Sequence, residues 1–286
     1  MARGPFPEAG STTPDRATAG NGRCRARHLP FDPNLIPGAG LLPLRDENPT
    51  LLVPVVTIGL IVVNVAVWLY VQGAGMSQDV LGRSVCAFGM IPAEITGRLG
   101  DYTAIDLGPG VPPCAFGGLT WQAALTSMFM HGGWVHLLSN MWFLWLFGNN
   151  VEDSMGHLRF VVFYLLAGGA AAAAHTLANP GSMVPTVGAS GAISGVMGAY
   201  LVLYPRIRIQ TLFFVFIFIR VIPVRAWVVL ILWFGTQLLS GYTDAVTSSG
   251  VAFWAHIGGF IAGVLLVKPF ENRALVRARR GRVTDV

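Results

Sequence analysis

Residues 188–204 read GASGAISGVMGAYLVLY, an apolar segment that opens with a serine between glycines. A second apolar segment, VAFWAHIGGFIAGVLLV at residues 251–267, contains a single histidine. Both approach the roughly 20 residues that span a bilayer as a helix. Polar side chains at membrane depth are costly and usually face a protein interior or a watery cavity. The two segments therefore predict a helical membrane protein with a hydroxyl and an imidazole in its interior.

The composition of the whole chain favours the same class. Of its 286 residues, 53% are hydrophobic and 12% are charged, and the mean hydropathy is +0.58. Because soluble domains carry about 25% charged residues, we expect a multi-pass membrane protein in contact with the lipid bilayer. The net charge of +5 lies in tails and loops beside apolar segments, where it sets orientation. It therefore does not indicate a nucleic-acid partner.

The chain divides into three parts. Residues 1–50 are rich in Pro, Gly and Arg, which predicts a disordered cytoplasmic tail. Residues 51–270 hold the apolar segments and predict one membrane domain, and residues 271–286 form a basic cytoplasmic tail. Because no apolar h-region follows the early arginines, the first apolar run is expected to stay as an uncleaved anchor.

Six spans are predicted in the membrane domain. A long outer loop, residues 72–120, follows the first span, and its Gly and Pro content predicts compact structure. The stretch 211–240 admits one span with an interfacial lead-in, or two short spans. We favour one, because about ten residues of helix cover only about half of the ~30 Å hydrocarbon core. The predicted spans are 51–71, 133–149, 160–176, 188–204, 224–241 and 251–268.

The basic residues predict the orientation. With the N-terminus inside, 17 of the 19 Lys and Arg residues fall on the inner side, and only Arg83 and Arg98 fall outside. The positive-inside rule therefore predicts cytoplasmic termini. In this topology Ser190 and His256 begin spans that run in the same direction, so both are expected within roughly 10 Å of the outer surface.

A hydroxyl and an imidazole at one depth suggest a nucleophile and its base. Taken alone, Ser190 has a plainer interpretation as part of a small-residue helix interface. His256 shares a helix face with two glycines, and this face can pack closely on the glycine-rich segment of Ser190. Two such faces that each carry a polar residue favour a catalytic dyad. The supporting glycines are Gly188, Gly191, Gly259 and Gly263.

A third polar group lies at the start of the second predicted span. His136 and Asn140 are four residues apart and share a helix face, and His131 precedes them. An Asn amide and a His N–H can donate to the oxyanion of an acyl transfer, helped by the Ser190 amide. The competing interpretation is a metal site that joins both histidines to His256. Since no intramembrane carboxylate or cysteine accompanies them, we expect neither a metal nor another cofactor.

Taken together, these motifs resemble the rhomboid family of intramembrane serine proteases, bacterial members in particular, over about residues 50–270. The resemblance implies an all-α bundle of six transmembrane helices and a serine endopeptidase without an aspartate or a cofactor. Ser190 would be the nucleophile and His256 the general base. His136 and Asn140 would stabilise the oxyanion, with His131 in a supporting role. The motif residues outside this set are Gly188, Gly191, Gly259 and Gly263.

The resemblance also implies partners and a location. Substrates would be transmembrane proteins cleaved near the outer face, and the expected location is a bacterial cell membrane. The fifth span and the loop near residues 241–250 would gate substrate access. Some members carry Trp-Arg where Trp121 and Gln122 stand here, and an aromatic where Ser194 stands. Without that ring, another group must orient His256, and Trp254 or a water are the candidates.

Other questions stay open at this level. A non-catalytic rhomboid-like binder of membrane helices predicts a missing serine or histidine, and both are present. A transporter with a histidine proton relay predicts repeated halves or intramembrane carboxylates. Cys86 and Cys114 share the outer loop and either pair or stay free. The natural substrate and the oligomeric state do not follow from the residues.

Overall fold

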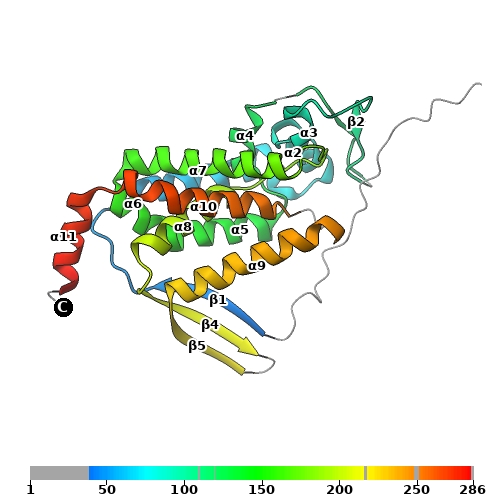
Figure 1. Ribbon diagram of the computed structural model, residues 1–286. Helices are drawn as coiled ribbons and strands as arrows, with labels where there is room; N and C mark the ends of the chain where they lie inside the picture. The colour runs from blue at the N-terminus through cyan, green and yellow to red at the C-terminus, as the bar shows by residue number, and fades with distance from the viewer. Residues whose placement is uncertain (1–38, 109, 119, 216–217, 248–250, 285–286) are drawn as a thin grey trace, which may run out of the picture.

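The computed structural model describes residues 39–284 apart from 109, 119, 216–217 and 248–250. Most of the described chain is helical, and the long helices run side by side in a bundle (Figure 1). The helices of the bundle are α1 (Val55–Ala66) continued by η2 (Val67–Val71), α5 (Trp134–Phe143) continued by η5 (Leu144–Gly148) and α6 (Asn149–Met155), α7 (His157–Ala178), α8 (Ser190–Leu203), α9 (Ala226–Thr247) and α10 (Phe253–Phe270).

These helices occupy the six segments predicted as spans, with shifted ends. By length and composition, α7, α9 and α10 are apolar and long enough to cross a membrane, and Val55–Val71 and Ser190–Leu203 are shorter apolar helices. The second predicted span extends further than expected, from α5 through η5 into α6. The helical membrane class is confirmed, although the described chain also contains short β-strands. The number of crossings stays a prediction.

A three-stranded antiparallel sheet lies beside α9 (Figure 1). Its strands are β1 (Ala39–Asp46), β4 (Arg208–Val215) and β5 (Phe218–Arg225), in the order β1-β4-β5. The prediction of a disordered tail is therefore wrong for residues 39–46, and the expected lead-in before the fifth span belongs to the β-hairpin of β4 and β5. The reason is that the backbone of β1 pairs with β4, a partner far along the chain, which local composition cannot reveal. Residues 1–38 lie outside the described part.

The single-helix interpretation of residues 211–240 agrees with the structure, because one helix, α9, follows the hairpin. The sequence placed its start near residue 224, and the strand β5 ends at Arg225. The next helix, α10, therefore runs in the same direction as α8. This places the beginnings of α8 and α10 at the same end of the bundle.

The loop 72–120 is compact, as predicted. Its elements gather at the end of the bundle opposite to the last helix, α11 (Arg273–Thr284) (Figure 1). Cys86 and Cys114, whose pairing the sequence left open, form a disulfide, and Cys114 is buried with Ile91 and Ile105 in a small apolar core. The elements of this region are η3 (Gly73–Gly75), α2 (Gln78–Phe88), α3 (Pro92–Ile95), β2 (Ala104–Ile105) and β3 (Cys114–Ala115), followed by α4 (Ala123–Thr126) and η4 (Ser127–Phe129).

Two carboxylates at the end of the bundle near α11 hold α1 and the segment before it against α6. Glu152 accepts hydrogen bonds from the Thr57 amide (2.8 Å) and hydroxyl (2.7 Å). Asp153 accepts from the amides of Leu51 (2.9 Å) and Leu52 (2.6 Å). Both acids lie in α6. There Glu152 satisfies an amide in the first turn of α1, which has no partner within the helix. Asp153 satisfies two amides of the segment just before α1.

Close packing of α8 and α10 forms the centre of the bundle. A Cβ built on Gly259 would lie 2.0 Å from the Gly191 carbonyl oxygen, and one on Gly263 would lie 1.9 Å from that of Gly195. No side chain fits at such distances, so glycine is required where the two backbones cross. The predicted packing of two glycine faces is thus present, and it brings the starts of both helices together.

Candidate active site

Ser190 is the first residue of α8, and a glycine turn presents it. Gly188 has a φ of 129°, in the region that favours glycine. A Cβ on Gly188 would lie 2.7 Å from Nε2 of His136 and 3.4 Å from Oγ of Ser190. The turn therefore needs a glycine for its backbone angle and also for the space that the imidazole of His136 occupies.

The structure brings Ser190 and His256 together. Nε2 of His256, in the first turns of α10, lies 2.8 Å from Oγ of Ser190. The two residues are half-buried and come from neighbouring helices, 66 positions apart in the chain. At this distance the hydroxyl can donate to the imidazole, the arrangement of a nucleophile and its base.

A third residue, Gln237 of α9, completes the contact. Nδ1 of His256 lies 2.7 Å from Oε1 of Gln237. The partner that sequence reasoning sought in Trp254 or a water is therefore an amide of the fifth predicted span. Sequence reasoning missed it, although a polar side chain at membrane depth was the available signal. The site that it predicted drew only on the second, fourth and sixth spans.

Aromatic rings flank the imidazole. The Trp233 ring centre lies 6.0 Å from that of His256, and Phe253 meets the imidazole edge-on at 6.4 Å. Ser194, which stands where some rhomboid proteins carry an aromatic, instead donates to the Ser190 carbonyl at 2.6 Å. The ring next to the imidazole is thus supplied by α9, not by α8.

Hydrogen-bond donors gather around Ser190. The amide of Gly132 donates to Nδ1 of His136 at 3.2 Å, so a neutral His136 ring carries its hydrogen on Nε2, the atom beside Gly188. The Ser190 amide belongs to the first turn of α8, where amides have no partner within the helix. Both N–H groups are suited to receive negative charge on a substrate oxygen.

Asn140 differs from the expectation. Its Nδ2 donates to the carbonyl of His136, four residues earlier, at 2.8 Å. The hydrogen bond that Asn140 makes is therefore within its own helix, a common choice for a short amide side chain. Sequence pattern shows that Asn140 and His136 share a face but cannot show which acceptor the amide takes.

His131 packs behind His136. The His131 amide donates to Oε1 of Gln72 at 2.8 Å, and its carbonyl accepts from Nε2 of Gln72 at 2.7 Å. The buried imidazole meets that of His136 edge-on, with ring centres 5.1 Å apart. The backbone of His131 is thus held by Gln72, and its buried ring packs against the ring of His136.

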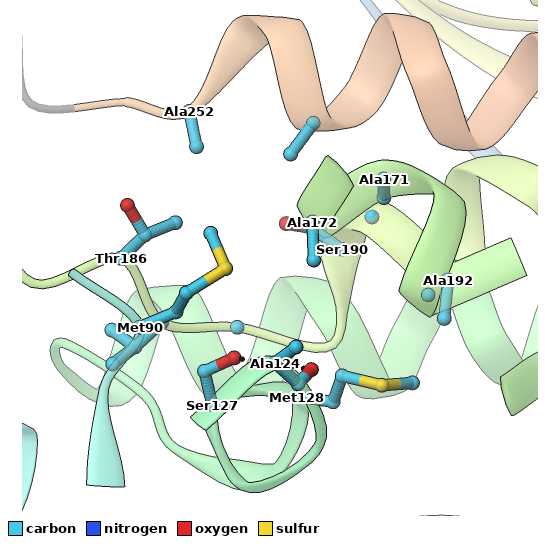
Figure 2. Close-up of a pocket in the computed structure, with 15 residues that line it drawn as sticks. Met90, Ala124, Ser127, Met128, Ala171, Ala172, Thr186, Ser190, Ala192 and Ala252 are labelled. Carbon is cyan, nitrogen blue, oxygen red and sulfur yellow. Dashed lines mark hydrogen bonds between the residues drawn. The ribbon is translucent and has the colours of Figure 1, made fainter. Parts of the chain in front are cut away.

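A small pocket opens beside Ser190 (Figure 2). Alanine methyls and glycines form much of its wall, with Met90, Ser127 and Met128 around the rest. Among the residues that the structure describes, no three His, Cys, Asp or Glu side chains are grouped to hold a metal ion. The small-residue part of the lining is Ala124, Gly168, Ala171, Ala172, Gly188, Gly191, Ala192, Ala252 and Ala255.

The family of this protein follows from its match to a family model. A family model described as the rhomboid domain matches residues 118–271, more than half of the chain. This protein belongs to the rhomboid family. The rhomboid domain contains every site residue predicted from the sequence, from His131 to Gly263.

Individual relatives support the same assignment. The chain is 34% identical over 143 residues to Rhomboid protease GluP of Bacillus subtilis, 31% over 157 residues to RHOMBOID-like protein 5 of Arabidopsis thaliana, and 34% over 143 residues to Rhomboid protein 1, mitochondrial, of Saccharomyces cerevisiae. These matches cover 50%, 53% and 49% of this chain and 25%, 46% and 39% of the relatives. The chain thus matches less than half of each relative. Because both bacterial and eukaryotic rhomboid proteins match, the bacterial type stays a prediction.

Proposed function

We propose that this rhomboid protein is an intramembrane serine endopeptidase that cleaves transmembrane segments of other membrane proteins. The observation that carries the proposal is the 2.8 Å contact between Oγ of Ser190 and Nε2 of His256. The name of one relative, Rhomboid protease GluP, is consistent with it. The starts of α8 and α10, which carry these two residues, lie at the end of the bundle near the loop 72–120 (Figure 1). Cleavage near the outer face then follows from the predicted orientation.

The reaction begins with proton transfer to His256. As Oγ of Ser190 attacks the substrate carbonyl carbon, Nε2 of His256 takes the hydroxyl proton. The carbonyl oxygen becomes an oxyanion that accepts hydrogen bonds from Nε2 of His136 and the Ser190 amide. His256 then protonates the leaving amine, the C–N bond breaks, and the acyl group remains on Ser190 as an ester.

Water completes the cycle. His256 removes a proton from a water that attacks the ester carbonyl, and the same donors hold the second oxyanion. The bond to Oγ breaks, Ser190 regains its proton from His256, and the new carboxylate leaves. No step requires a metal or a cofactor.

The pocket supports a preference for small side chains next to the cleaved bond. Its volume is only about 30 Å³, so it has room for little more than a small side chain beside Ser190. A peptide bond inside a helix is protected by the helix hydrogen bonds, so the substrate must unwind locally. Small residues such as glycine lower the cost of unwinding, and the same residues fit the pocket.

Cleavage of a reporter transmembrane substrate in proteoliposomes tests the proposal. Ser190→Ala and His256→Ala are each expected to abolish cleavage while the protein still inserts. Ser182→Ala removes a hydroxyl from the loop before α8 and is the matched control that keeps activity. Retained cleavage in either dyad variant overturns the mechanism.

A serine-directed fluorophosphonate separates the alternatives. The proposed enzyme reacts with it at Ser190, and Ser190→Ala blocks the reaction. A non-catalytic helix binder or a transporter leaves the probe unreacted, because neither requires an activated hydroxyl.

A further inference from the structure

We propose that Gln237 is a positioning residue that holds the base His256 in its productive tautomer. The site would then work as a serine–histidine–glutamine triad, not as a dyad alone. This inference rests on the proposed protease function and extends it to α9, a helix that supplied none of the residues predicted from the sequence.

The contact between Gln237 and His256 fixes the tautomer of the imidazole. Oε1 of Gln237 is a carbonyl oxygen and can only accept a hydrogen bond. Since it lies 2.7 Å from Nδ1 of His256, Nδ1 must carry the hydrogen. A neutral imidazole then has its lone pair on Nε2, 2.8 Å from Oγ of Ser190. This tautomer is the one that can take the serine proton.

Contacts within α9 orient the amide of Gln237. Nε2 of Gln237 lies 3.1 Å from Oγ1 of Thr236 and 3.5 Å from the Trp233 carbonyl oxygen. The Trp233 carbonyl oxygen can only accept a hydrogen bond. A flipped amide would place Oε1 of Gln237 beside this second acceptor, with no hydrogen between them. The local contacts of α9 therefore aim the carbonyl end of Gln237 at His256.

A glutamine acts on a catalytic histidine differently from an acidic partner. In a serine–histidine–aspartate triad the carboxylate selects the same tautomer and also stabilises the imidazolium. A glutamine supplies the first effect without placing a charge at membrane depth, where an ionised side chain is costly. The neutral amide is therefore a suitable orienting group for a base in this environment.

Aromatic rings surround the contact between Gln237 and His256. Trp233, one turn before Gln237, lies beside the imidazole, with ring centres 6.0 Å apart. Phe234 stacks on Phe260 of α10 at 4.6 Å. These rings seat the face of α9 that carries Gln237 against α10. The hydrogen bond to His256 is thus part of the packed interface between the two helices.

The experiment compares Gln237→Met with Gln237→Glu. Methionine keeps the length of the side chain and removes the acceptor, whereas glutamate restores an acceptor oxygen. Leu238→Met, at an exposed neighbouring position of α9, is the control for any disturbance of the helix. Two rates are measured: fluorophosphonate labelling of Ser190, and cleavage of the reporter substrate resolved into kcat and KM.

Gln237→Met is expected to lower both kcat and the labelling rate by roughly 10- to 100-fold, the effect of losing a buried hydrogen bond to the reacting base. KM is expected to stay within about twofold, because the amide acts on the base and not on substrate binding. Gln237→Glu should recover most of the lost labelling rate. The small probe needs no movement of a transmembrane substrate past α9, so its rate reports on the base.

Three results would overturn the inference. One is labelling of Gln237→Met at the wild-type rate, and another is a Glu variant no faster than the Met variant. The third needs no variant: ¹⁵N NMR of the wild-type protein showing the hydrogen of neutral His256 on Nε2. In each case normal labelling of the wild type leaves the proposed protease standing. An unreactive wild-type Ser190 would instead refute the protease itself.

Discussion

Two neighbours of α10 hold it in different ways. Against α8, the backbones touch through glycines, and a methyl group at Gly263 would meet the Gly195 carbonyl at 1.9 Å. Against α9, the contact consists of aromatic rings and the bond between Gln237 and His256. The first interface sets the distance between nucleophile and base, and the second orients the base. Backbone contact tolerates almost no change, whereas side-chain contact can weaken by degrees.

The largest effect is expected at the glycine crossing. Gly263→Val puts a branched side chain where not even a methyl group fits, so α8 and α10 must separate. Overpacking of this kind typically costs about 1–3 kcal/mol and shifts the backbone. We expect a lower unfolding temperature in detergent and no detectable labelling of Ser190.

Gly235→Ala is the control for this change. A Cβ there meets no atom within 4 Å, so stability and labelling should match the wild type. If Gly263→Val also behaved like the wild type, the close approach of the two backbones would be incorrect.

Gly188→Ala is expected to have the next largest effect, on activity more than on stability. A side chain at a φ of 129° is strained, and its methyl group would displace His136 from beside Ser190. A displacement of about 1 Å in a catalytic group can cost 100-fold in rate. The measurement is kcat for the reporter substrate together with the unfolding temperature. An active variant with an unchanged kcat would show that His136 does not stabilise the oxyanion.

A smaller effect is expected on the α9 side. Trp233→Leu removes the ring beside His256 but leaves the glycine crossing and Gln237 in place. An aromatic contact of this kind is worth about 0.5–1.5 kcal/mol, which corresponds to a labelling rate about 2- to 10-fold lower. A complete loss of labelling would mean that α9 is as indispensable as α8, against the contrast between the two interfaces.

Asn140→Ala is expected to have the smallest effect, a decrease in kcat of about threefold. Its amide donates to the His136 carbonyl within α5, and other donors remain for the oxyanion. Loss of a direct oxyanion donor typically costs about 100- to 1,000-fold. Steady-state kinetics therefore distinguish the two roles, and a decrease of 100-fold would restore the direct role expected from the sequence.

Local patterns were sufficient for the helical part of the protein. Long apolar segments predict buried or spanning helices because a bilayer offers the backbone no other hydrogen-bond partner. Glycines at helical spacing predicted the close approach of α8 and α10, since only glycine lets two backbones touch. A serine and a histidine at the same depth of parallel segments then predicted their meeting.

Contacts between distant segments could not be predicted from the sequence. Strand β1 forms because β4, far along the chain, offers its backbone hydrogen bonds, and the disulfide of Cys86 and Cys114 depends on how the loop folds. Gln237 was missed for the same reason, since its partner is 19 positions away on another helix. For Asn140 the helix face was predicted correctly, but its hydrogen bond to the His136 carbonyl was not.

The residues by themselves determined the membrane class, the pairing of Ser190 with His256 and the glycines between their helices, because periodicity and depth are properties of single segments. The folded chain alone determined the sheet beside α9, the partner of the imidazole and the hydrogen bond of Asn140. These depend on which side chains meet across helices, and distance in space is not encoded by spacing along one segment.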